Sequence, residues 1–464
     1  MNRTALHIGV SLVVGSLVLI QSPTHAQSRS DHWVGTWGTA VVVRPQTPPG
    51  PPAGFGTPVT PSCFGATPDA ATTTDGAAAP ATTTAPPPAG RGQGGPGGGR
   101  GGPPPAPANF NNQTLRQIVH TSLGGDRVRV VFSNAFGTAP LAVGAAHVAL
   151  REKDAAIVAG SDRVLTFGGS ATVNIPPGAS VISDPATLTV PAFADLAVDL
   201  FLPGDTASSP SPLTTHTGAL QTSYTSAAGN VAGAPDIPEA TQRAAWFFLS
   251  RVEVSAPERA GAVVTIGDSI TDGTRSTPNT NNRWPDYLAR RLHAANMPLA
   301  VLNEGIGGNR VLGDGAGVNI LARFDRDVLA QTGVTHVIVM EGINDIGLGR
   351  SGACPSAPDL IAAHQQLVER AHARGLRIFG ATLTPFDGAA YFTAEGEAKR
   401  QALNAWIRTS KVYDGVVDFD AAVRDPAAPT KIQERFDPGD HLHFNDAGYQ
   451  AMANAIDLAL FRKR

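Results

Sequence analysis

The sequence predicts a two-domain protein, in which an antiparallel β-sandwich precedes an α/β domain built on a parallel sheet. Apolar side chains recur at every second position in runs across residues 111–257, between turns rich in Gly and Pro, as in half-buried strands of a sandwich. From residue 258 onward, short apolar runs alternate with helical periodicity, which is typical of a three-layer α/β/α domain. One of these runs ends at Gly267 and is followed at once by Asp268 and Ser269, so a hydroxyl stands at the end of a buried strand.

Composition argues against two classes of partner. The 464 residues carry a formal net charge of -3, which gives no electrostatic basis for binding nucleic acid or an anionic membrane surface. We therefore expect no nucleic acid and no membrane as partners, and the oligomeric state stays open. The 51 Gly and 38 Pro residues are many for a compact protein and indicate a low-complexity stretch.

Residues 1–26 have the pattern of a cleavable signal peptide. Arg3 supplies the positive charge, residues 6–20 are mostly apolar, and Ala26 closes a small-residue cleavage site. The apolar run is too short to span a bilayer comfortably, which disfavours a membrane anchor. We expect export, with cleavage after Ala26 and a secreted or periplasmic mature protein.

The first domain is interrupted in sequence. Residues 31–43 contain an aromatic, strand-like piece that we assign to the β-domain. Residues 44–110 are dominated by Pro, Gly, Ala and Thr, so they are predicted to be a disordered insertion, with a Pro-rich recognition ligand as the alternative. The sandwich proper is predicted at 111–257. We favour a packing or positioning role for it over carbohydrate binding, because no exposed aromatic platform is apparent.

The two cysteines, Cys63 and Cys354, exclude a disulfide framework and a thiolate zinc site. In an oxidising compartment they can form one bridge, and two free thiols are the alternative.

The α/β domain is predicted to occupy residues 258–464. A helical face of apolar residues from Leu360 to Ala371 is stopped by Gly375. Alternation of strands with such helices implies that the strands are parallel. The predicted strands are 262–267, 299–303, 334–340, 376–383 and 416–419.

Ser269 needs help to act as a nucleophile, because a serine hydroxyl is weak without a general base, and the base needs an orienting acceptor. Asp440 and His443 stand together in a polar loop before the last helix, so both can face one point. We expect His443 to take the proton of Ser269 while Asp440 fixes the imidazole tautomer. A metal site that uses Asp440, His441 and His443 is disfavoured, because no HExxH helix or distant third ligand accompanies them.

Two Gly-rich polar turns, 303–310 and 341–345, follow the second and third predicted strands. Carboxyl ends of parallel strands meet at one sheet edge, so both turns are expected near Ser269. A developing oxyanion needs preorganised donors. Gly308 can bring a backbone N–H close, and Asn344 can offer its side-chain amide. A phosphate cradle in the first turn is disfavoured, because neither GxGxxG nor GxxxxGK is present.

These segments, in this order, resemble the four sequence blocks of the SGNH (GDSL-type) hydrolase superfamily. The blocks are Gly-Asp-Ser-Ile at 267–270, the turn at Gly308, Gly-Ile-Asn-Asp at 342–345 and Asp-His-Leu-His at 440–443. They span nearly the whole second domain. Ile270 stands where the family name has Leu, and both are apolar packing residues.

The resemblance implies a flavodoxin-like α/β/α fold and a role for each matched residue. Ser269 is the implied nucleophile, His443 the base and acid, and Asp440 the carboxylate that orients the histidine. The implied oxyanion hole consists of the Ser269 N–H, the Gly308 N–H and the Asn344 side chain. We expect no cofactor and no metal ion.

The other common serine-hydrolase fold, the α/β-hydrolase, expects GxSxG and an acid well ahead of its histidine. Here Thr271 stands at the second Gly position and the acid lies beside the histidine, so that fold is excluded. A β-sandwich ahead of the catalytic domain, and the loop 277–285, resemble exported acyl esterases of xylan breakdown. Arg283, Trp284 and Arg310 are candidates for substrate contact, with a structural role as an equal alternative.

The sequence therefore predicts a serine esterase that hydrolyses short acyl esters, with acetyl groups on plant polysaccharide as the preferred substrate. An arylesterase or lipase acting on small aliphatic or aryl esters is the alternative within enzymes. A carbohydrate-binding protein with a vestigial hydrolase domain is the alternative from another class. The intact Ser269, Gly308, Asn344, Asp440 and His443 argue against it.

Overall fold

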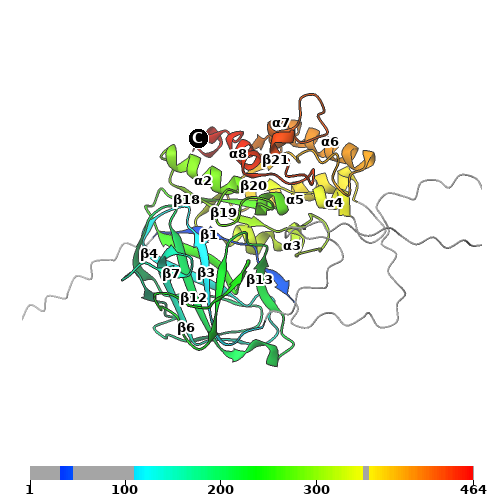
Figure 1. Ribbon diagram of the computed structural model, residues 1–464. Coiled ribbons are helices and arrows are strands. Elements are labelled where there is room, and N and C mark those ends of the chain that lie inside the picture. Colours follow the sequence, from blue (N-terminus) through cyan, green and yellow to red (C-terminus); the bar gives the residue numbers. More distant parts are fainter. Residues whose placement is uncertain (1–31, 45–108, 349–354, 463–464) are drawn as a thin grey trace, which may run out of the picture.

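The computed structural model describes residues 32–44, 109–348 and 355–462 (Figure 1). The predicted signal peptide, most of the predicted insertion, and both cysteines lie outside these residues. Within them, antiparallel sheets come first in the sequence and a parallel sheet follows. None of the helices in the described ranges has the length and apolar character needed to cross a membrane.

The β-domain is built on two main antiparallel sheets, accompanied by a small three-stranded sheet and a separate strand pair. The first main sheet contains β1 (Trp33–Gly38), β17 (Leu249–Ser255), β4 (Gly125–Ser133), β10 (Ser180–Ile182) and β11 (Ala186–Val190). The second contains β15 (Thr241–Arg243), β14 (Ser223–Ala228), β3 (Asn111–His120), β12 (Asp195–Asp205), β6 (Ala145–Lys153), β7 (Ala156–Ile157) and β8 (Arg163–Val164). The smaller sheets are β16 (Ala245–Phe247), β13 (Leu213–Thr217) and β2 (Val42–Arg44), and the pair β5 (Leu141–Val143) and β9 (Val173–Ile175).

The core of this domain lies between the two main sheets and follows the predicted alternation. Val128, Val130 and Phe132 of β4 are buried together with Leu196 and Val198 of β12 in one apolar cluster. The opposite face of the second sheet is also covered by other segments. The alternation of apolar and polar residues predicts that side chains on this face are exposed, whereas several are buried. Asp199 of β12 is buried on that face, because segments 155–157 and 231–237 pack over it.

The predicted insertion is wrong at both ends. Arg44 pairs with Leu213 as part of β2, and Phe110 is fully buried with its ring 4.9 Å from that of Phe247. The β-domain therefore retains these residues, because each adds to its sheets or its core. β1 pairs with β17 in the first sheet, although residues 45–108 separate it from most of the domain in the sequence.

The five strands of the parallel sheet lie in the order β19-β18-β20-β21-β22. Four predicted strands are confirmed, 334–340 with both ends as predicted and the other three with shifted ends, whereas the fifth is wrong at its end, because Asp418 caps a helix that begins at Phe419. The strands are β18 (Gly261–Gly267), β19 (Leu299–Gly305), β20 (Val334–Met340), β21 (Arg377–Ala381) and β22 (Gly415–Val417).

The direction in which the sheet is wound reverses at β18, since β19 lies on one side of it and β20 on the other. Right-handed crossovers then place α2 on one face of the sheet and α3, α5 and α6 on the other. Contacts agree, because α2 packs with α8, and α5 packs with α3 and α6. The helices are α1 (Ser269–Asp272), α2 (Trp284–Ala294), α3 (Ile320–Phe324), α4 (Ile343–Leu348), α5 (Ala357–His372), α6 (Ala394–Thr409), α7 (Phe419–Val423) and α8 (Asp446–Asn454).

A reversal of this kind opens a crevice at the carboxyl ends of the strands, where open α/β sheets bind their ligands. Ser269 comes two residues after the end of β18, so it stands at that point.

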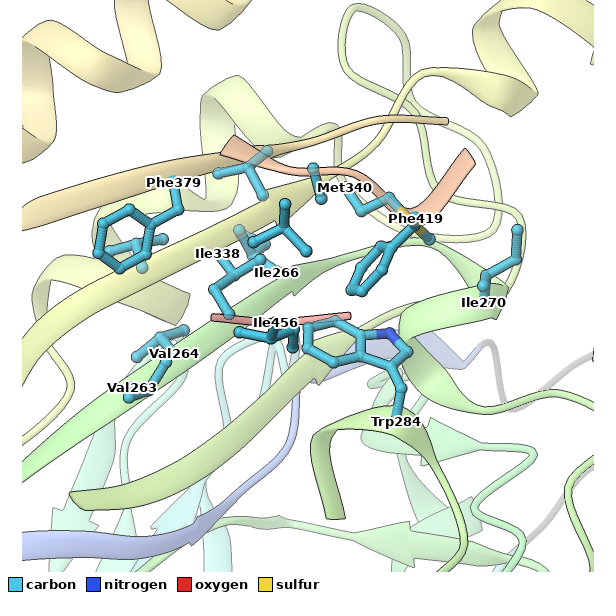
Figure 2. Close-up of a cluster of buried hydrophobic side chains, with 14 of the residues drawn as sticks. Val263, Val264, Ile266, Ile270, Trp284, Ile338, Met340, Phe379, Phe419 and Ile456 are labelled. Atoms are coloured by element: carbon cyan, nitrogen blue, oxygen red, sulfur yellow. The ribbon is translucent and has the colours of Figure 1, made fainter. Parts of the chain in front are cut away.

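Apolar side chains from the sheet and its helices form the core of the α/β domain (Figure 2). Trp284 lies inside this core, fully buried, with its ring 5.1 Å from that of Phe419.

The strand β1 lies between the two domains, paired with β17 and packed against β19 (Figure 1). Ser122 of the β-domain accepts a hydrogen bond from the backbone N–H of Val301, 3.0 Å away. Farther along, Asn279 of the α/β domain binds the backbone N–H of Thr222 at 2.7 Å. The two domains are therefore joined along a polar interface as well as an apolar one.

Candidate active site

Ser269 is the first residue of helix α1, which begins immediately after strand β18. The side chain of Asp268 caps this helix by accepting the N–H of Ile270 at 2.8 Å. Gly273 ends it at φ 96°, a left-handed conformation that favours glycine. The hydroxyl is thus carried on a single short turn at the sheet edge.

The structure brings the three predicted triad residues together. Nε2 of His443 lies 2.8 Å from Oγ of Ser269, and Nδ1 of His443 lies 2.9 Å from Oδ2 of Asp440. The other oxygen of Asp440 accepts the backbone N–H groups of Leu442 and His443 at 3.2 and 3.0 Å. These bonds fix the loop so that the carboxylate faces the imidazole.

The carboxyl group of Asp440 is held in its ionised form. Partial burial acts to raise its pKa, but hydrogen bonds from the His443 side chain and backbone outweigh burial, so the pKa lies well below its usual value. Arg275 adds to this effect, with Nε 3.0 Å from Oδ2 of Asp440. An ionised Asp440 accepts the Nδ1 proton of His443, which leaves Nε2 to act on Ser269.

His441, the neighbour that could be confused with His443, faces elsewhere. Its Nδ1 pairs with Asp437 within the same loop, and half of its side chain is exposed. Across the described ranges, no group of three His, Cys, Asp or Glu side chains is arranged to hold a metal ion.

Two of the three predicted oxyanion donors, Gly308 and Asn344, lie in turns that are bonded to each other. Gly308 adopts φ 76°, in the left-handed region where glycine is favoured. Asn344 is the second residue of α4, and its Nδ2 donates to the carbonyl of Asn309 at 3.0 Å, the residue after Gly308. Asp345 strengthens the connection by accepting the N–H of Val311 at 2.8 Å.

Residues 265–451, which contain this constellation, match the GDSL-like Lipase/Acylhydrolase family. The α/β domain belongs to that family. The protein is accordingly a carboxylic ester hydrolase. The match leaves the β-domain outside, so the family describes the second part of the chain only.

No curated protein matches the chain. Solved structures that resemble it include a GDSL-like lipase from Bacteroides thetaiotaomicron, 20% identical over 44% of this chain and 90% of that one, with a TM-score of 0.34. A carbohydrate acetylesterase family member from Sinorhizobium meliloti is 18% identical over 42% and 94%, with a TM-score of 0.34. The acetyl xylan esterase AlAXEase is 17% identical over 42% and 96%, with a TM-score of 0.33.

The substrate-contact candidates lie in structural positions. Trp284 is fully buried in the core of the GDSL-like domain, so it has no surface to offer a substrate, which corrects that expectation. Arg283 occupies the N-cap position of α2, where its backbone N–H donates to Asp286, and its side chain donates to the carbonyl of Ala219 in the β-domain, so it serves the domain interface. Arg310 is largely buried, and its positive charge acts to lower the pKa of Asp345.

Arg323 is a structural residue of the site that the sequence reasoning missed. Its buried guanidinium donates to the carbonyl of Gly267 at 3.1 Å, to the carbonyl of Glu304 at 2.8 Å and to Oδ1 of Asn309 at 2.9 Å. One side chain therefore connects the end of the Ser269 strand with the Gly308 turn. The available signal was a lone Arg between the apolar residues Ile320 and Phe324 of a short amphipathic segment.

Arg275 is a second residue that was missed. It adopts φ 76° although it is not glycine, a backbone conformation that is strained for a residue with a Cβ. Such strain is commonly found at functional sites. In this case it accompanies the contact between Arg275 and Asp440, and no local sequence pattern predicts it.

Carboxyl groups are buried beneath this edge of the sheet. Burial raises the pKa of Asp268 to about 7 and that of Asp345 to about 6. Burial also raises the pKa of Glu341 well above its usual value, with further increases from the neighbouring Asp268 and Asp345. These groups therefore keep their protons to a higher pH than ordinary carboxyl groups do, which limits negative charge below the position of Ser269.

Proposed function

We propose that this protein is an exported serine esterase that removes short acyl groups, first of all acetyl, from a polysaccharide such as xylan. The single observation that carries the esterase mechanism is the hydrogen-bonded relay from Ser269 through His443 to Asp440, with contacts of 2.8 and 2.9 Å. A nucleophile, a base and an orienting carboxylate within hydrogen-bonding reach are the arrangement that acyl transfer needs.

In the first half-reaction, Oγ of Ser269 attacks the ester carbonyl while Nε2 of His443 removes the hydroxyl proton. The carbonyl oxygen becomes an oxyanion, for which the N–H groups of Ser269 and Gly308 and the side-chain amide of Asn344 are the proposed donors. The imidazolium of His443 then gives its proton to the leaving alcohol, and an acyl-enzyme remains on Ser269. Throughout, the ionised Asp440 stabilises the imidazolium.

In the second half-reaction, His443 takes a proton from water, and the resulting hydroxide attacks the acyl-enzyme. Collapse of the tetrahedral intermediate returns the proton to Oγ of Ser269 and releases the carboxylic acid. Each proton is passed through His443, so the mechanism needs no other group to carry it.

The first experiment compares wild type with Ser269→Ala on p-nitrophenyl acetate. We expect turnover to fall to the background rate, and a fluorophosphonate to label Ser269 of the wild type, as located by mass spectrometry. Undiminished turnover by Ser269→Ala, or labelling at another residue, would reject the nucleophile. A vestigial hydrolase domain predicts no turnover by the wild type at all.

The substrate part of the proposal rests on the loop 277–285 and on the order of the two domains, which resemble exported acyl esterases of xylan breakdown. Its test is a panel of acetylated xylan, acetylated pectin and p-nitrophenyl esters of increasing chain length. We expect the highest kcat/KM on acetyl esters and release of acetate from xylan. A preference for long aliphatic chains would instead favour the lipase alternative.

Export has its own test. Expression of the full chain in a bacterial host with both membranes intact, followed by fractionation, should recover activity outside the cytoplasm. The N-terminal sequence of the recovered protein should begin at Gln27, directly after the predicted cleavage site. An intact N-terminus in the cytoplasmic fraction would contradict the proposal.

A further inference from the structure

Helix α1, which carries Ser269, is joined to the β-domain by a buried contact. The helix has four residues, and its last residue is Asp272. Oδ1 of Asp272 lies 3.1 Å from Nε2 of His216, which belongs to β13 of the β-domain. The side chains are 11% and 3% exposed, so solvent screens the contact little.

The second ring nitrogen of His216 determines where the protons are. Nδ1 lies 2.8 Å from the carbonyl oxygen of Ala40. A carbonyl only accepts, so Nδ1 must carry a hydrogen, and Nε2 can bind the Asp272 carboxylate only if it carries one as well. The contact is therefore an imidazolium–carboxylate pair, or a pair that shares one proton.

The electrostatics agree with this assignment. Burial acts to lower the pKa of His216, but the charge and hydrogen bond of Asp272 and the bond to Ala40 raise it above its usual value. Arg283, the other charged group that acts on this imidazole, opposes the shift without reversing it.

A second connection holds the same helix from the other side. Nδ2 of Asn303 donates to the carbonyl of Thr271 at 2.8 Å, and the backbone of Asn303 forms a bridge with Thr39, which precedes Ala40. Gly305 lies so close that a Cβ there would be 2.3 Å from the backbone nitrogen of Asp272. The end of α1 is thus enclosed between the β19 turn and the β-domain.

Within α1 itself, little fixes the direction of the hydroxyl. Three backbone bonds close the turn, from Asp272 to Asp268 and from both Gly273 and Thr274 to Ser269, each of 2.9 Å. A helix of one turn is marginal without contacts outside itself. The orientation of Ser269 toward His443 therefore depends on what holds the end of the helix.

We propose that His216 is a positioning residue for the nucleophile: through Asp272 it fixes helix α1, and with it Ser269, so the β-domain contributes to catalysis. This inference rests on the proposed role of Ser269. A displacement of about 1 Å in a reacting group can cost about 100-fold in rate. Loss of the contact should therefore appear in kcat, whereas binding of the ester changes little.

The test uses two substitutions of His216 that separate its two contacts. In His216→Gln the side-chain amide reaches the position of Nε2 and can still donate to Asp272. In His216→Asn the amide reaches only the position of Nδ1, so the bond to Ala40 can remain and the bond to Asp272 is lost. Both variants are neutral, polar and similar in volume, so their effects on folding should be alike.

On p-nitrophenyl acetate, we expect kcat of His216→Asn to be about tenfold to 100-fold lower than that of His216→Gln, with KM changed less than about threefold. The rate at which a fluorophosphonate labels Ser269 should fall in parallel. Ser122→Ala is the matched control, because it removes an interdomain bond to Val301 that involves no residue of α1. It should lower Tm and leave kcat at the wild-type value.

Equal kcat in the two His216 variants would overturn the positioning role. A decrease in the kcat of Ser122→Ala as large as that in His216→Asn would overturn it as well. The proposed function fails separately, by retained turnover in Ser269→Ala. If Ser269→Ala is inactive while both His216 variants match the wild type, the esterase mechanism stands and the inference about His216 is rejected.

Discussion

In the β-domain, the buried carboxylates of Asp199 and Glu253 lie against arginines, whereas in the GDSL-like domain the buried carboxyl groups of Asp268 and Glu341 lie near other carboxyl groups. Arg116 binds Asp199 through two nitrogens at 2.8 and 2.7 Å. Burial acts to raise the pKa of Glu253, but the charges of Arg251 and Arg129 lower it overall. In the GDSL-like domain the pKa values of Asp268 and Glu341 are raised instead.

The difference separates two uses of buried polar groups. A buried ion pair with its hydrogen bonds complete is a structural device, and breaking it leaves an uncompensated charge. Acidic groups buried without a matching cation cost stability, and exceptions of this kind are expected at functional sites. Substitutions in the β-domain should therefore act mainly on stability, and those at the sheet edge on turnover and its pH dependence, with His216 as the proposed exception.

The largest effect is expected from Asp440→Asn. An amide presents the wrong hydrogen-bonding partner to Nδ1 of His443, so kcat on p-nitrophenyl acetate should fall about 10⁴-fold. KM should change little, because Asp440 contacts the histidine and not the ester. Asp437→Asn, which alters the partner of His441 in the same loop, is the control and should keep near wild-type kcat. Equal losses in both variants would mean that loop damage, and not orientation of His443, is the cause.

In the β-domain, Arg116→Met should reduce the free energy of unfolding by about 3–5 kcal/mol, because it leaves Asp199 buried without its cation. Urea denaturation at neutral pH measures this, and kcat per folded molecule should remain at the wild-type value. The double variant Arg116→Met, Asp199→Leu should recover much of the loss. A fall in kcat without a change in unfolding would contradict the structural role of this pair.

Asn344→Ala tests the sheet edge with a smaller change. Removal of one oxyanion donor should lower kcat about 10²- to 10³-fold. The side chain also bonds the carbonyl of Asn309, so a modest drop in Tm should accompany the loss. If KM rises and kcat stays constant, Asn344 contributes to binding of the substrate and not to stabilisation of the oxyanion in the transition state.

The smallest effect concerns pH. A carboxyl group whose folded pKa is raised binds more protons folded than unfolded, so it makes the folded state less stable as pH rises above its unfolded pKa. Glu341, with a usual pKa of 4.5 and a raised folded value, should behave in this way. Glu341→Gln removes that contribution. The decline in Tm from pH 5 to pH 8 should be shallower in the variant, as measured by calorimetry, and an equally steep decline would exclude Glu341 as a source.

Much of the GDSL-like domain was predictable from local patterns. The strand 262–267 is buried over its whole length and 334–340 is buried from His336 onward, and most of their side chains are apolar, as in strands buried on both faces. The spacing of Asp440 and His443 places both in one turn. In the structure, Nδ1 of His443 lies 2.9 Å from Oδ2 of Asp440. The predicted end of the last strand, residue 419, is wrong. Asp418 caps a helix that begins at Phe419, so the strand ends before the apolar run in the sequence does.

The rest could not be predicted, because it depends on partners that are distant in the sequence. Nothing near Arg323 indicates that it binds the carbonyl of Gly267, 56 residues away. Trp284 has the same local sequence whether it faces a substrate or the core. The burial of Asp199 depends on segment 231–237, which folds over the sheet from another part of the chain.

By itself, the sequence determined the strand that ends in Gly-Asp-Ser, the loop that holds the histidine and the carboxylate, and the division into a β and an α/β part. These features follow from periodicity and turn chemistry, which act over a few residues. Only the tertiary structure decided that His216 of one domain contacts Asp272 of the other. A buried charged group needs a partner of opposite charge, and which residue lies close enough to be that partner depends on how the chain packs.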